Sequence, residues 1–162
     1  MLAALGLGAG AALLLLRWRP FRVEIEGDSM MPTLRPGDWA LAARPRRIRR
    51  GDVVVIEHPE RPGFEMVKRV IAIAGDPVGG RVLAPGEVWV QGDHPARSTD
   101  SRTFGPVSGN AVRATVRLIY WPPERRRWLG GEATAPGSRA RAANLAANRG
   151  AGDAEPDRSP GR

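Results

Sequence analysis

Between residues 22 and 121, hydrophobic residues occur in short runs that alternate with polar, proline-rich and glycine-rich segments. The runs are RVEIE, WALAAR, DVVVIE, EMVKRVIAIA, GEVWVQ and AVRATVRLIYW, and the segments between them include RPGD, RRGD, ERPG, GDPVGG and LAPG. Short β-rich runs separated by such turn residues are typical of strands, and no helical period of useful length lies between them. The pattern predicts a mainly β fold, a compact sheet or barrel-like core.

The N-terminal end has a different pattern. Residues 1–16, MLAALGLGAGAALLLL, carry no charged side chain and are followed by RWRPFR. As a helix they would rise about 24 Å, slightly less than a bilayer core of about 30 Å, and Trp18 could extend the span to the interface. A cleaved signal sequence has a basic start and a small-residue cleavage site, and neither is present here. We therefore expect residues 1–19 to form one uncleaved membrane anchor helix, with a buried core helix as the alternative.

The C-terminal end lacks any apolar period. From Gly130 onward the chain is rich in Gly, Ala, Arg and Pro. Such a composition cannot bury enough apolar surface to fold, so we expect residues 130–162 to be a disordered tail. The folded domain is then expected at residues 20–129.

Composition narrows the possible chemistry. The chain has no cysteine, and its two histidines, His58 and His94, lack the spacing of metal ligands, so we expect neither metal nor cofactor. Each histidine precedes a proline, which suggests that it lies in a turn. The net charge of +8 is concentrated in ARPRRIRRG and PPERRRW. Basic runs of this kind can bind nucleic acid or anionic lipid, although they are commonly solvated loops. No helix-turn-helix pattern or zinc-finger spacing is present, so we expect no nucleic-acid partner.

One lysine stands among the basic residues. Lysine and arginine together number 25, and Lys68 is the only lysine. On a strand Lys68 would share an apolar face with Met66 and Val70, where burial disfavours the ammonium form. A lysine in such a place can give up its proton, whereas an arginine cannot. Lys68 is therefore a candidate general base.

The candidate nucleophile lies in EGDSMMPTLRPGD. Ser29 follows an expected strand and precedes the turn at Pro32, so its hydroxyl would be presented outward. A serine hydroxyl becomes a strong nucleophile only when a neighbouring base takes its proton, and Lys68 could do so if the two meet in space. Met30 and Met31 follow in the same loop, where exposed apolar groups would line a groove or dip toward a membrane. The alternative is a structural serine in an ordinary turn.

Four motifs in order resemble the type I signal peptidase family, peptidase S26, the Ser/Lys-dyad processing peptidases that include the mitochondrial inner membrane peptidases. GDSMMPTLRPGD is similar to the nucleophile segment of the family, RRGDVVVIEHP to the strand that follows it, and VKRVIAIAGD to the lysine segment. VWVQGDHPARSTDSRTFGPV is similar to the acidic-serine segment near the end of the core.

The resemblance implies roles for individual residues. Ser29 would be the acyl-forming nucleophile and Lys68 the general base, and the backbone N–H of Ser29 would form part of an oxyanion hole. Ser98 would hydrogen-bond and orient the lysine amine. Asp100 and Arg102 would hold this region together as a charge-assisted pair. Met30, Met31 and Pro32 are then candidates for the substrate groove.

Two positions depart from the usual family pattern. Many bacterial members have a serine two residues before the nucleophile that donates to the oxyanion, and Gly27 stands there in this chain. This leaves the second donor unidentified. The usual Gly-Asp-Asn is Gly92-Asp93-His94 here, so the local turn differs.

The resemblance favours a serine endopeptidase that removes signal or leader peptides from precursor proteins, which would bind as an added strand. One alternative is a maturation protease that trims the propeptide of a single client, such as a nickel-containing superoxide dismutase. Another is a self-cleaving regulatory or nucleic-acid-binding module.

The expected location is a single-pass position in the cell membrane. The family resemblance favours an extracytoplasmic catalytic domain. Arg17 and Arg19 after the apolar segment favour the cytoplasmic face by the positive-inside rule. The expected partners are precursor proteins and the lipid bilayer.

Overall fold

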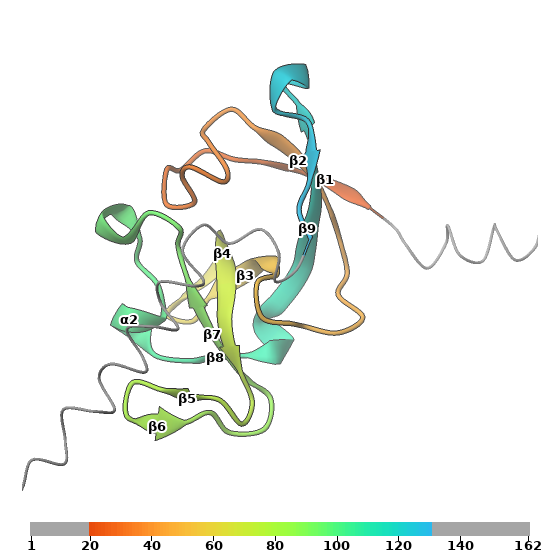
Figure 1. Cartoon of the computed structure of the whole chain (residues 1–162). Coiled ribbons are helices and arrows are strands. Elements are labelled where there is room, and N and C mark those ends of the chain that lie inside the picture. The colour runs from red at the N-terminus through yellow and green to blue at the C-terminus, as the bar shows by residue number, and fades with distance from the viewer. Residues whose placement is uncertain (1–19, 131–162) are drawn as a thin grey trace, which may run out of the picture.

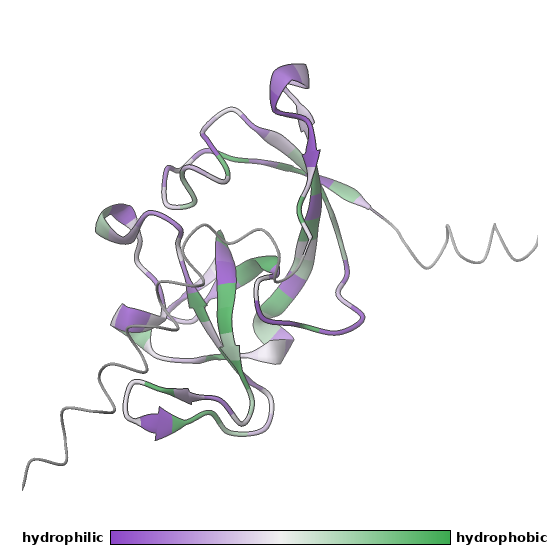
Figure 2. Ribbon diagram, in the orientation of Figure 1, coloured by the Kyte–Doolittle hydropathy of each residue, from purple (hydrophilic) through white to green (hydrophobic). Residues whose placement is uncertain are grey.

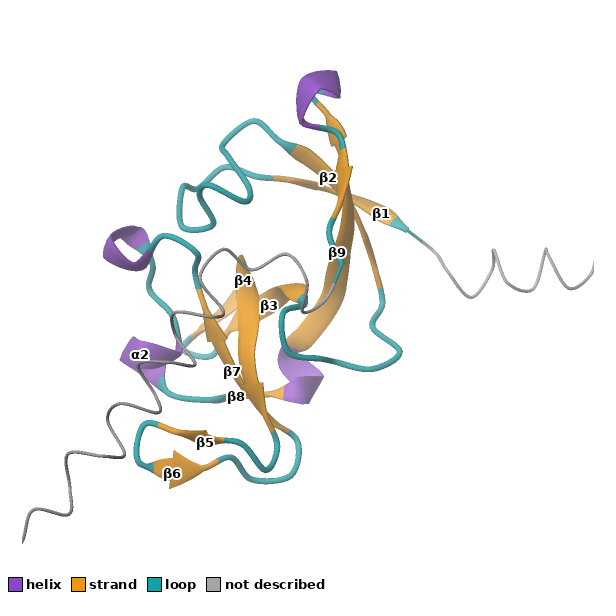
Figure 3. Cartoon of the chain, viewed as in Figure 1, coloured by secondary structure: helices purple, strands orange, loops and turns teal. Residues whose placement is uncertain are grey.

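Strands form most of the ordered chain. The computed structural model describes residues 20–130, and Figure 3 shows strands joined by loops, with only short helical segments. The strands are β1 (Phe21–Glu24), β2 (Trp39–Ala43), β3 (Val53–His58), β4 (Arg61–Ile73), β5 (Pro77–Val78), β6 (Arg81–Val82), β7 (Glu87–Gln91), β8 (Val107–Ser108), β9 (Val112–Trp121) and β10 (Arg127–Trp128). The helical segments are α2 (Ser101–Phe104) and the 3-10 turns Pro95–Arg97, Gly109–Ala111 and Pro123–Arg125. The prediction of a mainly β fold is confirmed.

One antiparallel sheet contains all strands except β5 and β6, which pair with each other. Its order is β1-β2-β9-β3-β4-β7-β8, with β10 also paired to β9. Although β9 is late in the sequence, it lies between β2 and β3, with Ala42 opposite Val116 and Val55 opposite Ala114 (Figure 1). The late strand therefore joins the early part of the chain to the part that contains β3, β4 and β7.

The core has two hydrophobic clusters that share strand β3. Val53 and Val55 pack in the first cluster, whereas Val54 and Ile56 pack in the second. Successive residues of a strand point to opposite faces, so residues 53–56 of β3, which are all apolar, are buried on both sides of the sheet. Figure 2 shows green, hydrophobic stretches along β3 and β4, and purple, hydrophilic residues in the 3-10 turn after β9 and in β6.

Three local predictions from sequence differ from the structure. The predicted turn ERPG is shorter, because β4 begins at Arg61. The segment GDPVGG contributes to a small hairpin of β5 and β6. His58 ends β3 instead of standing in a turn, and its buried ring lies edge-on to Phe64 and against Phe104. The turn itself lies one residue later, at Pro59 and Glu60, between β3 and β4.

The predicted membrane anchor at residues 1–19 lies outside the described residues, as does the predicted tail beyond Gly130. Among residues 20–130, no helix has the length and apolar character needed to cross a membrane.

Candidate active site

The loop between β1 and β2 carries Ser29. Its ends are closed by backbone hydrogen bonds from Ile25 to Asp38 (2.9 Å) and from Gly37 to Ile25 (2.8 Å). Within it, the amide of Leu34 donates to the carbonyl of Met30 at 2.9 Å. Met30 and Leu34 both belong to the first core cluster. The side chains of Met30 and Leu34 therefore hold the loop against the core, and Ser29 lies half-buried immediately before Met30.

Burial corrects one part of the sequence interpretation of this loop. Met30 is only 1% exposed and packs in the core, so it is not an exposed loop residue. Met31 is half-buried and Pro32 is exposed, with a cis peptide bond between them. Of the three groove candidates, Met31 and Pro32 remain accessible beside Ser29.

Lys68 lies on β4, opposite Val54 of β3. Its neighbours on the same face, Met66 and Val70, belong to the second core cluster, as does Val54. Lys68 itself is 4% exposed. Burial lowers the pKa of Lys68 below its usual value; the Asp100 carboxylate opposes this change and the Arg102 guanidinium adds to it. The strand thus holds an amine in surroundings that favour its neutral form.

The structure brings Ser29 and Lys68 together. Lys68 Nζ and Ser29 Oγ are 2.9 Å apart and hydrogen-bonded, although 39 residues separate them along the chain. This distance lies within the range for proton transfer between a nucleophile and its base.

The segment after β7 packs against Ser29. The amide of His94 donates to the carbonyl of Ser29 at 2.9 Å. Gly92 lies so close that an added Cβ would stand 2.5 Å from the Ser29 carbonyl oxygen and 2.3 Å from Ser98 Oγ. Cβ atoms do not approach other atoms so closely, so a glycine is required at position 92.

Asp100 organises the segment that contains Ser98. Its fully buried carboxylate accepts hydrogen bonds from the Gly92 amide (2.9 Å), from Ser98 Oγ (2.8 Å) and from Arg102 Nε and Nη2 (2.8 Å each). Although burial by itself raises the pKa of Asp100, the hydrogen bonds from Arg102, Gly92 and Ser98 hold it at about 2. The predicted pairing of Asp100 with Arg102 is therefore present in the structure.

The predicted contact of Ser98 is different in the structure. Its hydroxyl donates to Asp100, and among the described residues the hydrogen bond of Lys68 Nζ is made to Ser29. A direct Ser98–Lys68 hydrogen bond is not among those that residues 20–130 form. Ser98 nevertheless lies beside the site, because its Oγ would be 2.3 Å from a Cβ added at Gly92.

The residue after Lys68 supports the loop that carries Ser29 from the other face of β4. Arg69 is buried and forms a two-pronged ion pair with Asp93, at 2.8 Å from Nε and 2.7 Å from Nη2. It also donates to the Gly51 carbonyl at 2.8 Å and to Thr33 Oγ1 at 3.3 Å. One side chain therefore connects β4, the segment after β7 and the loop that carries Ser29.

A second ion pair secures the far end of the loop that carries Ser29. Buried Asp38 accepts from Arg125 Nε at 2.7 Å and from Nη2 at 2.8 Å, and also from the Arg35 amide at 2.8 Å. Arg125 and Arg127 both donate to the carbonyl of Thr33. Burial by itself would raise the pKa of Asp38, but the hydrogen bonds from Arg125 and Arg35 make the net change a lowering.

Sequence reasoning did not assign roles to Gly92, Arg69 or Asp93. Only the absence of a side chain matters at Gly92, and the partners of Arg69 come from three separate segments. The motifs Gly-Asp-His and Lys-Arg contain these residues, but their spacing does not show that they meet. Among residues 20–130, no three His, Cys, Asp or Glu side chains are grouped closely enough to hold a metal ion.

Comparison with known proteins agrees with this architecture. The family model described as "Signal peptidase, peptidase S26" matches residues 1–82 and 78–121. The chain is 39% identical over 120 residues to mitochondrial inner membrane protease subunit 2 of Mus musculus, covering 63% of this chain and 67% of that protein.

Two further relatives come from a plant and a yeast. Mitochondrial ATP-independent inner membrane protease subunit 1a of Arabidopsis thaliana is 40% identical over 118 residues, which cover 62% of this chain and 70% of that protein. Subunit 2 of the Saccharomyces cerevisiae inner membrane protease is 32% identical over 121 residues, covering 63% and 68%. The resemblance that the four motifs indicated is confirmed. The chain belongs to the signal peptidase family, peptidase S26, and is a serine-type peptidase.

Proposed function

We propose that this peptidase removes leader peptides from precursor proteins, with Ser29 as nucleophile and Lys68 as general base. The observation that carries the proposal is the 2.9 Å contact between the Ser29 hydroxyl and a lysine amine that is almost completely buried. Family membership supports the reaction class, and the relatives are named as inner membrane proteases. The assignment of the two residues rests on their geometry and their surroundings.

The reaction would begin with neutral Lys68. The Ser29 hydroxyl donates its proton to Nζ while Oγ attacks the carbonyl carbon of the scissile peptide bond. The tetrahedral intermediate collapses, the C–N bond breaks, and the leaving amine takes the proton from Lys68. A water molecule then gives a proton to Lys68 and attacks the acyl ester, and the proton returns to Ser29 as the ester bond breaks. The cycle is balanced and leaves both residues in their original forms.

The environment of Lys68 supports this protonation state. Asp100 is the carboxylate whose charge acts on the amine, but its hydrogen bonds go to Arg102, the Gly92 amide and Ser98. The positive charge of Arg102 offsets the negative charge of Asp100. An amine without a carboxylate of its own, buried among apolar groups, loses its proton more readily than one in water. We propose that Ser98 contributes by holding Asp100 in this arrangement.

The oxyanion of the intermediate requires donors near Ser29. The backbone N–H of Ser29 makes no hydrogen bond among the described residues, so it is available to an incoming carbonyl oxygen. At Gly27, an added Cβ would meet no atom within 4 Å. The space beside Gly27 is therefore open to a substrate. Glycine has no side chain that could donate a hydrogen bond to the oxyanion, so a second donor would have to come from another group.

The membrane association of the relatives supports a corresponding organisation here. We propose that residues 1–19 anchor the chain in the membrane, that residues 20–129 form the peptidase domain, and that residues 130–162 form a tail. The substrate would then be a precursor held at the same membrane, with the peptidase domain on the extracytoplasmic side. Exposed Pro32 and half-buried Met31 would contact the segment that precedes the cut.

The test uses the full chain in neutral detergent with a fluorogenic leader peptide that has alanines before the cleavage site. Ser29→Ala should reduce kcat/KM by at least about 10³-fold, because it removes the nucleophile. Ser108→Ala is the matched control: Ser108 is exposed on β8 and its hydroxyl only accepts from the Asn110 amide, so cleavage should stay within twofold. Cleavage by Ser29→Ala at the rate of the unchanged chain would disprove the proposal.

A further inference from the structure

A basic hollow lies away from the Ser29–Lys68 pair, where the β2–β3 loop faces the 3-10 turn before β9. Its volume is about 600 Å³. Its lining includes the guanidinium-bearing residues Arg44, Arg46, Arg47 and Arg113, with Ile48 and Val112 as apolar components. Phe21, the first residue of β1, forms part of the rim. The peptidase mechanism uses none of these residues.

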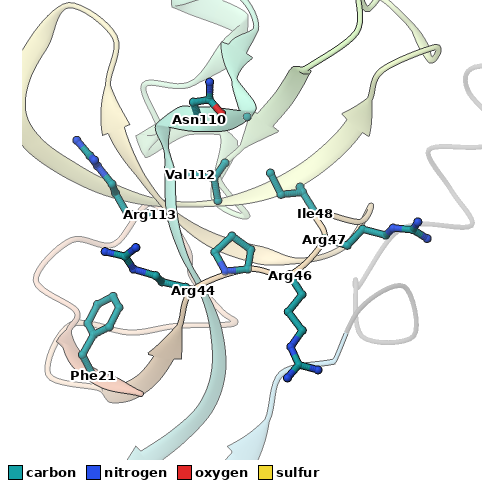
Figure 4. A pocket seen from close by; sticks show the side chains of 10 residues that line it. Phe21, Arg44, Arg46, Arg47, Ile48, Asn110, Val112 and Arg113 are labelled. Carbon is teal, nitrogen blue, oxygen red and sulfur yellow. The ribbon is translucent and has the colours of Figure 1, made fainter. Parts of the chain in front are cut away.

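The side chains in Figure 4 come from different segments of the fold. Arg44 and Arg113 extend on the same side as Phe21, whereas Arg46 and Arg47 extend from the other side of the β2–β3 loop. Asn110 adds an amide that can donate a hydrogen bond. The hollow therefore presents guanidinium groups on both sides of the loop and an amide above it.

The charges of the hollow are only partly balanced. Arg113 pairs with Glu57. Arg44, Arg46 and Arg47 are exposed and form no ion pair or side-chain hydrogen bond with any residue between 20 and 130. By contrast, the arginines that support the active site are paired, as Arg69 is with Asp93. An uncompensated group of guanidinium ions attracts a phosphate, which they can bind by paired hydrogen bonds.

The position of the hollow indicates where such a phosphate would come from. Phe21 is 41% exposed and lies two positions after residue 19, the end of the apolar N-terminal segment and its flanking arginines. An exposed aromatic side chain next to unpaired arginines is suited to the boundary between lipid headgroups and acyl chains. Phe21 is at the start of β1, and the chain leaves the other end of β1 toward Ser29.

We propose that this hollow binds the phosphate group of anionic phospholipids, with the unpaired Arg44, Arg46 and Arg47 as its contacts, while Arg113, which pairs with Glu57, lines it beside Arg44 and Phe21. The inference rests on the proposed membrane attachment of residues 1–19 but not on the Ser29–Lys68 chemistry. A headgroup bound here would fix the rotation of the domain about its anchor, and so the direction in which the Ser29 loop faces.

The test measures thermal unfolding of the full chain in neutral maltoside micelles during titration with dioctanoyl-phosphatidylglycerol. The unfolding midpoint should rise with this lipid, because a ligand that binds only the folded state stabilises it. The zwitterionic dioctanoyl-phosphatidylcholine should give no comparable rise. In the triple variant R44Q/R46Q/R47Q the apparent affinity for the anionic lipid should fall roughly 100-fold, since each arginine near an anionic surface contributes a factor of about five.

The matched control removes the same charge elsewhere. R35Q/R61Q/R126Q replaces three exposed arginines outside the hollow whose side chains have no partner among the described residues, so its affinity should change by less than about threefold. A cooperative thermal transition in the absence of added lipid, together with an unchanged circular dichroism spectrum, shows whether each variant is folded. If the triple variant does not fold, the single variant Arg44→Gln should still weaken lipid binding about fivefold.

Several results would overturn the inference. These are equal weakening in both triple variants, equal stabilisation by the two lipids, or stabilisation by inorganic phosphate as strong as that by the anionic lipid. Stronger stabilisation by a short DNA oligonucleotide than by the lipid would identify the hollow as a nucleic-acid site instead. Because unfolding is measured independently of cleavage, loss of the peptidase assignment would leave this result interpretable.

Discussion

The two faces of strand β4 place buried basic side chains in opposite environments. Lys68 and Arg69 are neighbours, and each is only 4% exposed. On one face Arg69 forms a two-pronged ion pair with Asp93 and two further hydrogen bonds, so its charge is matched. On the other face Lys68 contacts the Ser29 hydroxyl and has no carboxylate as a hydrogen-bond partner among the described residues.

The difference shows how one strand can serve both stability and chemistry. A buried charge that is paired and hydrogen-bonded holds separate segments together, whereas a buried amine without a counter-ion is pushed toward its neutral form. Arginine suits the first task because it stays charged and forms a planar fork. Lysine suits the second because its proton can leave. Because Lys68 and Arg69 are adjacent, strand β4 positions both the proposed base and the arginine of the Arg69–Asp93 ion pair.

The largest expected effect comes from making the two faces alike. Lys68→Arg places a permanent cation at the apolar face, and an arginine cannot accept the proton of Ser29. We expect kcat/KM for a leader peptide to fall by about 10⁴-fold. Lys68→Met, which keeps the apolar packing, should be equally inactive but folded. Cleavage by folded Lys68→Met at more than a tenth of the original rate would exclude Lys68 as the base.

The next effect concerns the supporting face. Arg69→Met leaves the Asp93 carboxylate, whose side chain is only 11% exposed, without its partner, and breaking a largely buried pair in this way costs about 3–5 kcal/mol. Urea unfolding should therefore show a much lower midpoint. Arg97→Met is the comparison, because Arg97 and Asp28 form an exposed pair at 2.8 Å and should contribute about 1 kcal/mol or less. Equal losses for the two variants would mean that burial of the Arg69 pair is not what stabilises the loop.

A smaller effect is expected where the segment after β7 meets the Ser29–Lys68 face. In Gly92→Ala the new Cβ would stand 2.3 Å from Ser98 Oγ and 2.5 Å from the Ser29 carbonyl, so the loop that carries Ser29 must shift. A displacement of about 1 Å can reduce catalysis by about 100-fold, which steady-state kinetics would detect. Gly130→Ala, whose Cβ would meet no atom within 4 Å, should leave kcat/KM unchanged. Full activity in Gly92→Ala would show that the segment yields without moving Ser29.

The smallest expected effect is a gain in stability. Because burial lowers the pKa of Lys68, Lys68→Met should unfold at a higher urea concentration near pH 7, by on the order of 1 kcal/mol. Between the folded and unfolded pKa values of Lys68, the unfolded chain binds more protons, so the stability of the unchanged chain rises with pH. The advantage of Lys68→Met should therefore shrink as the pH approaches 10.5. A difference between the two chains that does not vary with pH would contradict the lowered pKa.

Sequence reasoning predicted the strands better than it predicted their supporting contacts. The runs WALAAR, DVVVIE and GEVWVQ correspond to β2, β3 and β7 within a residue or two, because alternation and β propensity are local properties. Met30 was expected to be exposed in a loop, yet it is buried in the core, because the loop folds back over the sheet. The hairpin of β5 and β6 was missed because strands of two residues leave almost no periodic signal.

The sequence by itself determined a mainly β chain, a lone lysine on an apolar strand face and a serine in a proline-bounded turn, because each depends on residues close together in the chain. Tertiary structure decided that Lys68 meets Ser29, that Gly92 must lack a side chain, and that Arg69 joins three segments. These contacts depend on strand order and on the closure of loops across tens of residues. The hydrophobic pattern specifies which face of a strand is buried, but it does not specify which distant groups that face will touch.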